Sequence, residues 1–216
     1  MKRIVILASG SGSNAQAVIE ACRRRELEAE VVAVISNVEG AGALERAMSL
    51  GIEAILLPSP PLRDVPRRAV YDRELACEVA SLDPDVIVLA GWMLILGPAF
   101  MEAFPGRIIN VHPALLPDDA GDCVATSQGS LPTLRGAHAV RDALRARLPI
   151  TGATVHLVTQ DVDSGPVLLR EELVILAGDD EVSLHGRIKE IEHRLLPLAV
   201  AMLIGSESAE MPEQES

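Results

Sequence analysis

Aromatic residues are scarce in this chain of 216 residues, which has one Trp, one Tyr and two Phe. Platforms on which nucleic-acid bases could stack are therefore nearly absent. Lys and Arg together number 19 against 31 Asp and Glu, and the resulting net charge of −12 repels both a phosphodiester backbone and an anionic membrane surface. We expect no nucleic acid and no membrane among its partners.

Cysteine is also rare, since only Cys22, Cys77 and Cys123 occur, far apart in the chain. An odd number at such spacings supports neither a disulfide framework nor a CxxC pair for metal or redox chemistry. The histidines show no HExxH spacing, so we expect no metal. The first apolar run stops at Gly10, too early for a signal peptide or a membrane span. These absences predict a cytoplasmic protein.

Apolar residues, by contrast, make up 49% of the chain, enough to bury a core. Short, branched and almost continuously apolar segments have the pattern of parallel strands that are covered on both faces. They are residues 3–8, 31–36, 52–57, 85–90 and 107–111. Helical periodicity lies between them, in a helix that Ser13 would cap and in an amphipathic stretch over 67–82. This alternation predicts an α/β fold with a doubly wound, mostly parallel sheet.

The last third of the chain has a different pattern. Residues 151–158 and 167–175 resemble strands joined by a turn-rich segment, which predicts an antiparallel extension of the sheet. Helices are predicted over 134–147 and 182–204. Residues 118–132 are rich in Gly, Asp and Ser without periodicity, so they are predicted to form a long loop without regular structure.

A glycine-rich segment, SGSGSN at residues 9–14, follows the first predicted strand. Ligands of open α/β sheets lie beyond the carboxyl ends of the strands, and glycines there let backbone N–H groups approach a phosphate at a helix start. The dinucleotide pattern GxGxxA also begins at Gly10, but the second strand ends at Ser36 and Asn37 instead of an acid, which disfavours NAD. A tight turn without any ligand is the alternative.

Asn110 and His112 end the fifth predicted strand, and a strand's period of two places both on one side. A histidine that titrates near neutrality beside an amide that can donate to an oxyanion suits acyl or formyl transfer. The later segment TQDVDSGP, residues 159–166, could bring a carboxylate that raises the histidine pKa. A histidine satisfied by backbone groups and an ordinary turn are the alternatives. His156, inside an apolar strand, is expected to be structural, with a supporting role left open.

Four motifs in one order carry a resemblance to a known family. They are SGSGSN at 9–14, DVIVLAGWM at 85–93, NVHPALLP at 110–117 and GATVHLVTQDVDSGP at 152–166. Over about the first 200 residues the chain resembles the phosphoribosylglycinamide formyltransferases. The resemblance implies formyl transfer from 10-formyltetrahydrofolate, as co-substrate, to the amine of phosphoribosylglycinamide in purine biosynthesis, without a metal.

Position by position, the resemblance implies three groups of site residues. The catalytic residues would be Asn110, His112 and Asp163. Those for phosphoribosylglycinamide would be Gly12, Ser13, Asn14, Asn110, Lys189, Glu190, Ile191 and Glu192. Those for the folate would be Arg68, Met93, Leu94, Ile95, Leu96, Thr159, Gln160, Asp161, Val162 and Asp163.

The chain departs from the family pattern at two places. Leu94 stands where family members commonly carry Arg, so a side-chain contact to the folate would be lost. Residues 118–130 look like an insertion after the LLP motif, in the loop over the active site, and we expect a lid or a modified lid.

The resemblance also organises the chain. We expect one formyltransferase domain over 1–204, with a nucleotide-binding half (1–106) and a catalytic and folate-binding half (107–204), then a disordered acidic tail at 205–216. Small-molecule substrates are the expected partners, and the protein would be a monomer or a homodimer. Two other functions are considered. The first is a formyltetrahydrofolate deformylase, whose usual N-terminal regulatory domain is expected to have no room before residue 3. The second is a non-catalytic nucleotide-binding module.

Overall fold

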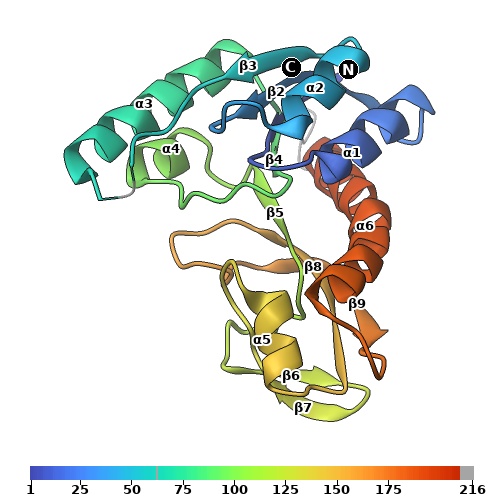
Figure 1. Ribbon diagram of the computed structural model, residues 1–216. Helices are drawn as coiled ribbons and strands as arrows, with labels where there is room; N and C mark the ends of the chain where they lie inside the picture. The colour runs from blue at the N-terminus through green and yellow to red at the C-terminus, as the bar shows by residue number, and fades with distance from the viewer. Residues whose placement is uncertain (62, 210–216) are drawn as a thin grey trace.

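The computed structural model describes residues 1–61 and 63–209, and a seven-stranded sheet forms its centre (Figure 1). The strand order is β3-β2-β1-β4-β5-β8-β9. The strands are β1 (Lys2–Leu7), β2 (Ala29–Ser36), β3 (Glu53–Leu56), β4 (Val86–Leu89), β5 (Ile108–His112), β8 (Ile150–Leu157) and β9 (Val167–Val174). The first five pair in parallel, while β8 runs antiparallel to both β5 and β9. The predicted fold class and its antiparallel extension are confirmed.

Helices cover both faces of the sheet. They are α1 (Ser13–Arg23), α2 (Gly42–Ser49), α3 (Val65–Ser81), α4 (Pro98–Ala103), α5 (Ala139–Arg145) and α6 (Glu181–Ala209). Side chains alternate along β1, so Ile4 and Ile6 pack with α1 and α6, whereas Val5 and Leu7 pack with α3 and α4. Both faces of β1 are apolar for this reason. Within the described part of the chain, no helix is both long and apolar enough to cross a bilayer.

The connections from β1 and β4 create the crevice that positions the site. Strand β1 lies between β2 and β4, and the chain leaves β1 toward β2 on one side but enters β4 on the other. The loops that follow β1 and β4 therefore meet at a topological switch point, where the Ser9 N–H donates to the Gly91 carbonyl at 3.0 Å. Ligands of doubly wound sheets bind at this edge.

The prediction that residues 118–132 form a loop without regular structure is wrong, because the chain forms a hairpin there. Strands β6 (Cys123–Thr126) and β7 (Gly129–Pro132) pair with each other and lie apart from the main sheet (Figure 1). Val124 and Leu131 point to one side of the hairpin, where they pack with Leu115 and Ile150 in a small apolar cluster. These apolar contacts supply the burial that a two-stranded ribbon needs to be stable.

The last two helices differ from their predicted bounds. Helix α5 begins at Ala139 instead of residue 134, because the preceding residues contact the polar site described below. Helix α6 continues to Ala209, five residues beyond the predicted end, so the predicted tail begins as helix. The rest of that tail, 210–216, lies outside the described residues.

Candidate active site

A cavity of about 550 Å³ lies at the carboxyl ends of β1, β4 and β5. Its walls are the glycine segment 9–14, the loop after β4, the end of β5, residues 156–163 and one face of α6. All three predicted catalytic residues, Asn110, His112 and Asp163, line it together with the glycine segment. A cavity of this size accommodates small organic ligands.

The glycine segment leaves the first turn of α1 uncapped. The residue that precedes α1 is Gly12, at a left-handed φ of 80°, and no described side chain caps the helix. The predicted cap by Ser13 is wrong, since Ser13 is itself the first helical residue. A Cβ on Gly12 would lie 2.4 Å from the Cα of Ala43, so only glycine fits. Free N–H groups of the first turn therefore face the cavity, as an anion site requires.

Helix α6, which packs against α1, presents three side chains to the cavity. His185, Lys189 and Glu192 recur at helical spacing and line the cavity. Sequence reasoning missed His185. The other two predicted residues of this group do not reach the cavity, because helical periodicity turns Glu190 to the solvent and buries Ile191 in the core.

Asn14 joins the glycine segment to α6. Its Nδ2 donates to Glu192 Oε2 at 2.8 Å, while its Oδ1 is buried without a hydrogen-bond partner among the described residues. Burial raises the pKa of Glu192, although the Asn14 hydrogen bond and the Lys189 charge oppose the rise. These groups offer a ligand both an amide and a carboxyl group.

The pairing of β5 with β8 places four polar side chains on one face of the sheet. Asn110 lies opposite His156, and His112 lies opposite Thr154. The Asn110 Nδ2 is 3.2 Å from His156 Nε2. Thr154 Oγ1 accepts from the Leu116 N–H at 3.0 Å and donates to the Ala114 carbonyl at 2.8 Å, which fixes the LLP segment against β8.

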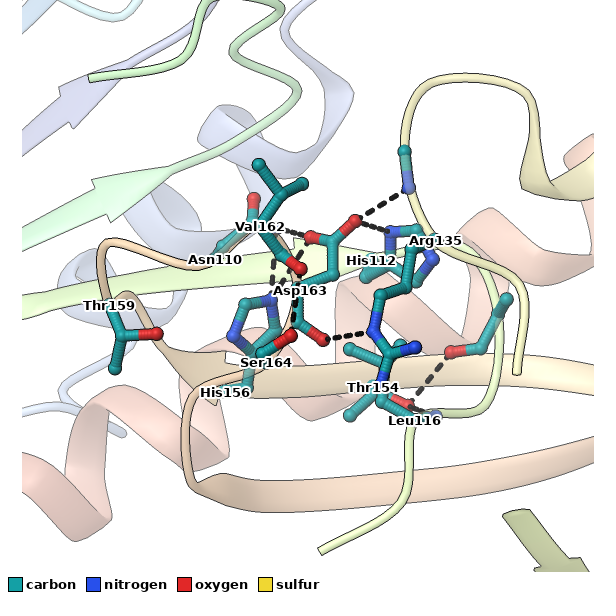
Figure 2. A network of polar contacts seen from close by, with 12 residues as sticks. Asn110, His112, Leu116, Arg135, Thr154, His156, Thr159, Val162, Asp163 and Ser164 are labelled. Carbon is teal, nitrogen blue, oxygen red and sulfur yellow. Dashed lines mark hydrogen bonds and ion pairs between the residues drawn. The ribbon is translucent and has the colours of Figure 1, made fainter. Parts of the chain in front are cut away.

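Asp163 stands at the centre of this polar network (Figure 2). Its Oδ2 is 3.4 Å from His112 Nδ1, and its Oδ1 is 3.5 Å from both His156 Nε2 and Asn110 Nδ2. The loop between β8 and β9 folds back closely enough that a Cβ on Gly165 would meet the Leu157 carbonyl oxygen at 1.9 Å. This close approach, possible only with glycine, brings the predicted catalytic residues into contact.

Burial changes the electrostatics expected for this network. Burial disfavours ionisation of Asp163, but the hydrogen bond from His156, the charge of His112 and the Gly136 N–H lower its pKa to about 2. The charge of Asp163 raises the pKa of His112, as predicted, but other contributions outweigh this one. Burial of His112 lowers its pKa more than the Asp163 charge and the hydrogen bond to the Leu134 carbonyl raise it, so the net pKa lies below the usual value.

Two main-chain groups after the hairpin complete the network, and sequence reasoning missed both. The Leu134 carbonyl oxygen is 2.7 Å from His112 Nε2, and the Gly136 N–H donates to Asp163 Oδ2 at 2.7 Å. Backbone groups carry no side-chain signal. The glycine at 136, which adopts a positive φ of 79°, is a residue type that favours a turn, but the sequence pattern predicted a helix there. His156 is likewise more than a core histidine, because it contacts both Asn110 and Asp163.

The predicted folate residues lie on two loops that border the cavity. Met93 to Leu96 and Thr159 to Asp163 all line it. Met93 and Ile95 are 60% and 68% exposed, which leaves apolar surface free for a ligand. Arg68 does not line the cavity: its Nη2 donates to the Ile95 carbonyl at 3.2 Å from outside the loop. Arg68 thus supports the loop that borders the cavity.

The hairpin does not cover the cavity. None of residues 118–132, all of which the structure describes, lines it. At its tip, the Ser127 N–H donates to Glu172 Oε1 on β9 at 2.9 Å, which directs the hairpin along the antiparallel edge. In this structure the hairpin therefore lies outside the cavity wall, and the expectation that it is a lid or modifies one stays a prediction. Across residues 1–61 and 63–209, no group of three His, Cys, Asp or Glu side chains is arranged to hold a metal ion.

Comparisons with known proteins agree with one another. A family described as "Formyl transferase" matches residues 2–200. The chain is 39% identical to the phosphoribosylglycinamide formyltransferase of Escherichia coli K12 over 198 residues, 92% of this chain and 85% of the relative. It is 41% identical to the protein of that name from Mycobacterium tuberculosis H37Rv, over 93% of this chain and 84% of the relative. A solved structure of glycinamide ribonucleotide transformylase 1 from Symbiobacterium toebii has a TM-score of 0.83 and 36% identity, and the match covers 95% of this chain and 89% of that chain.

Proposed function

We propose that this chain, which belongs to the formyl transferase family, transfers the formyl group of 10-formyltetrahydrofolate to the amine of phosphoribosylglycinamide in purine biosynthesis. One observation carries the proposal. The contact of Asp163 with His112, at 3.4 Å, lies in the same cavity as the uncapped glycine segment, so an anion-bearing amine and a formyl donor can meet there. We further propose a cytoplasmic protein that acts as a monomer or a homodimer on small molecules.

The nucleotide would occupy the end of the cavity between α1 and α6. Its phosphate would accept from the main-chain N–H groups of Gly12, Ser13 and Asn14, which no described side chain occupies. Lys189 and Glu192 would hold the ribose and the glycinamide, because both side chains line this wall. The unpartnered Asn14 Oδ1 supports this placement, since it offers a buried acceptor that a ligand hydroxyl or amide can satisfy.

The folate would lie at the other end, between the loops 93–96 and 159–163. These loops provide exposed apolar side chains, of which Met93, Ile95 and Val162 are the largest. Leu94 provides no charge for the glutamate part of the folate, so this ligand would be held through apolar and main-chain contacts. The two ligands would then meet near Asn110 and His112.

The proposed chemistry forms one carbon–nitrogen bond, breaks another, and moves one proton between the two nitrogens. The glycinamide nitrogen attacks the formyl carbon, and the carbonyl oxygen becomes an oxyanion that Asn110 and His112 stabilise. The bond from that carbon to the folate N10 then breaks. The proton lost by the attacking nitrogen is balanced by the proton that N10 gains, and His112 would pass it on. Tetrahydrofolate and the formylated nucleotide are the products.

The depressed pKa of His112 fits this sequence of events. Burial outweighs the Asp163 charge, so the pKa of His112 lies below its usual value and the free site favours the neutral ring. An oxyanion that forms beside the ring adds a second negative charge, and an opposite charge favours the protonated ring. His112 would therefore become cationic as the tetrahedral intermediate forms, which is when a proton must be held.

One assay separates this function from its rivals. The protein is mixed with 10-formyltetrahydrofolate, with and without phosphoribosylglycinamide, and free tetrahydrofolate is followed. We expect release only when the nucleotide is present. Release without the nucleotide would indicate a deformylase, and no release in either mixture would indicate a non-catalytic nucleotide-binding module.

A further inference from the structure

Three successive residues after the hairpin contact the catalytic residues, and the middle one is an arginine. Leu134 accepts from His112, and Gly136 donates to Asp163, as described above. Between them, Arg135 Nε donates to the main-chain carbonyl of Asp163 at 3.3 Å (Figure 2). The carboxylate of Asp163 is thus held by Gly136, and its backbone by Arg135.

The same guanidinium also binds the base of the hairpin. Its Nη2 donates to the carbonyl oxygens of Ala120 at 2.7 Å and Gly121 at 2.8 Å. The hairpin base is closed by Thr133, whose N–H donates to the Asp122 carbonyl at 2.9 Å. Because the donors of an arginine form one rigid planar fork, a single side chain fixes the hairpin base and Asp163 relative to each other.

Both backbones that Arg135 joins are strained. Asp163 has a φ of 50° and Ala120 a φ of 55°, in the left-handed region that residues with a Cβ rarely adopt. Such conformations persist only where the surroundings hold them. Asp163 depends on this most, because a relaxed backbone would move its carboxylate away from the two histidine rings.

We propose that Arg135 is a positioning residue for formyl transfer: it holds the main chain of Asp163 in its left-handed conformation, and through it the base of the inserted hairpin supports the catalytic centre. This inference rests on the proposed function. In this proposal only the base of the hairpin supports the catalytic centre. Its outer part, residues 124–131, contributes apolar packing against Leu115 and Ile150. Arg135 does not itself line the cavity.

The first experiment compares Arg135→Gln with Arg170→Gln. Arg170 is a matched control, because it also donates to a main-chain carbonyl of this region, that of Leu116 at 3.0 Å, while none of its described contacts is with Asp163. We expect Arg135→Gln to lower kcat tenfold to a hundredfold with both KM values within about twofold, since misplacement of a catalytic group reduces turnover more than binding. Arg170→Gln should keep kcat within about twofold, and Arg135→Lys should recover part of the loss.

The second experiment measures hydrogen exchange, which needs no activity. In Arg135→Gln, the Gly136 N–H and the main chain of 161–165 should exchange about tenfold faster, whereas Arg170→Gln should leave both unchanged. If the wild type shows no formyl transfer, the proposed function fails, and exchange still decides whether Arg135 holds Asp163. Unchanged exchange in Arg135→Gln, or an equal loss of kcat in Arg170→Gln, would overturn the inference.

A shortened hairpin separates its base from its outer part. Residues 124–131 are replaced by Asn-Gly, which favours a two-residue turn and keeps Ala120, Gly121 and Arg135 in place. We expect kcat within about threefold of the wild type, with a lower melting temperature because the packing of Val124 and Leu131 is lost. A large loss of kcat with both KM values raised would place the effect in the outer hairpin and contradict the inference.

Discussion

The glycine segment after β1 and the polar network around Asp163 face the same cavity but are built in different ways. The glycine segment offers main-chain N–H groups from neighbouring residues, and a single tight turn at Gly12 orients them. The network offers side chains from β5, β8 and the 158–166 loop, held by main-chain groups from 134–136. The first depends on local backbone geometry, and the second depends on segments that are distant in sequence.

The two regions also differ in burial. In the glycine segment Gly10 and Ser11 are exposed and Ser13 is half-buried, although Gly12 and Asn14 are buried, so a ligand can reach the loop from the side of Gly10 and Ser11. His112 and His156 are 3% and 2% exposed, and the Asp163 side chain is 9% exposed. Electrostatic interactions are stronger in such surroundings, and removing one partner there is costly. Substitutions in the network should therefore affect chemistry, and substitutions in the glycine segment should affect nucleotide binding.

The largest expected effect comes from His112→Ala and Asp163→Asn. Each should lower kcat by about a thousandfold, because each removes a group that meets the developing charge or holds the one that does. The dissociation constant for phosphoribosylglycinamide, measured by calorimetry, should stay within about threefold. Full turnover in either variant would refute the assigned roles, and a lost nucleotide affinity would show that the two regions are not independent.

Gly12→Ala tests the other region, with Gly40→Ala as its control. Both glycines have positive φ values, 80° and 70°, but a Cβ at Gly12 meets Ala43, whereas no described atom lies within 4 Å of one at Gly40. We expect Gly12→Ala to raise the KM for the nucleotide at least tenfold and to lower the free energy of unfolding by about 3 kcal/mol. Gly40→Ala should cost about 1 kcal/mol and leave KM unchanged. Equal effects in urea titrations and kinetics would contradict the steric argument.

The depressed pKa of Asp163 predicts a dependence of stability on pH. The unfolded state binds this proton with the usual pKa of 3.8 and the folded state with about 2, so the stabilisation is complete above about pH 5 and most of it is lost as the pH falls to 2. The shift corresponds to roughly 2 kcal/mol in total, of which about 1 kcal/mol is lost by pH 3. Between pH 6 and pH 3, the wild type should lose that much more unfolding free energy than Asp163→Asn in urea titrations. Parallel losses in both proteins would show that the carboxylate is not stabilised by folding.

Leu94→Arg should have the smallest effect, and it concerns the loop between the two regions. The variant adds a cation to a cavity wall where the family resemblance predicts one, so the KM for 10-formyltetrahydrofolate should fall about two- to fivefold at low salt. The KM for the nucleotide should not change. Ile95→Arg, one position along the same loop, is the control for added charge, and an equal fall there would mean that position 94 is not special.

Much of the fold could be predicted from the sequence, because its strands and longest helices carry strong periodic patterns. The almost continuously apolar strands and the polar residues that follow β1 and β5 indicated both the sheet and its functional edge. The hairpin was not predicted, because its stability comes from Leu115 and Ile150, which lie outside it. Two helix bounds were also predicted wrongly: α5 begins later than expected, and α6 ends later than expected. The reason is similar, because a local pattern does not show which backbone groups have partners elsewhere in the molecule.

The sequence alone therefore determined the α/β class, the glycine segment and Asn110 and His112 as candidates, since these depend on residue type and on periods of two and 3.6. The resemblance to the family singled out Asp163 within the loop 159–166. Only the tertiary structure decided that Glu190 and Ile191 turn away from the cavity, that Arg68 lies behind its loop, and that burial lowers the pKa of His112. The physical reason is that exposure and desolvation belong to the assembled molecule, because they depend on neighbours brought together from distant parts of the chain.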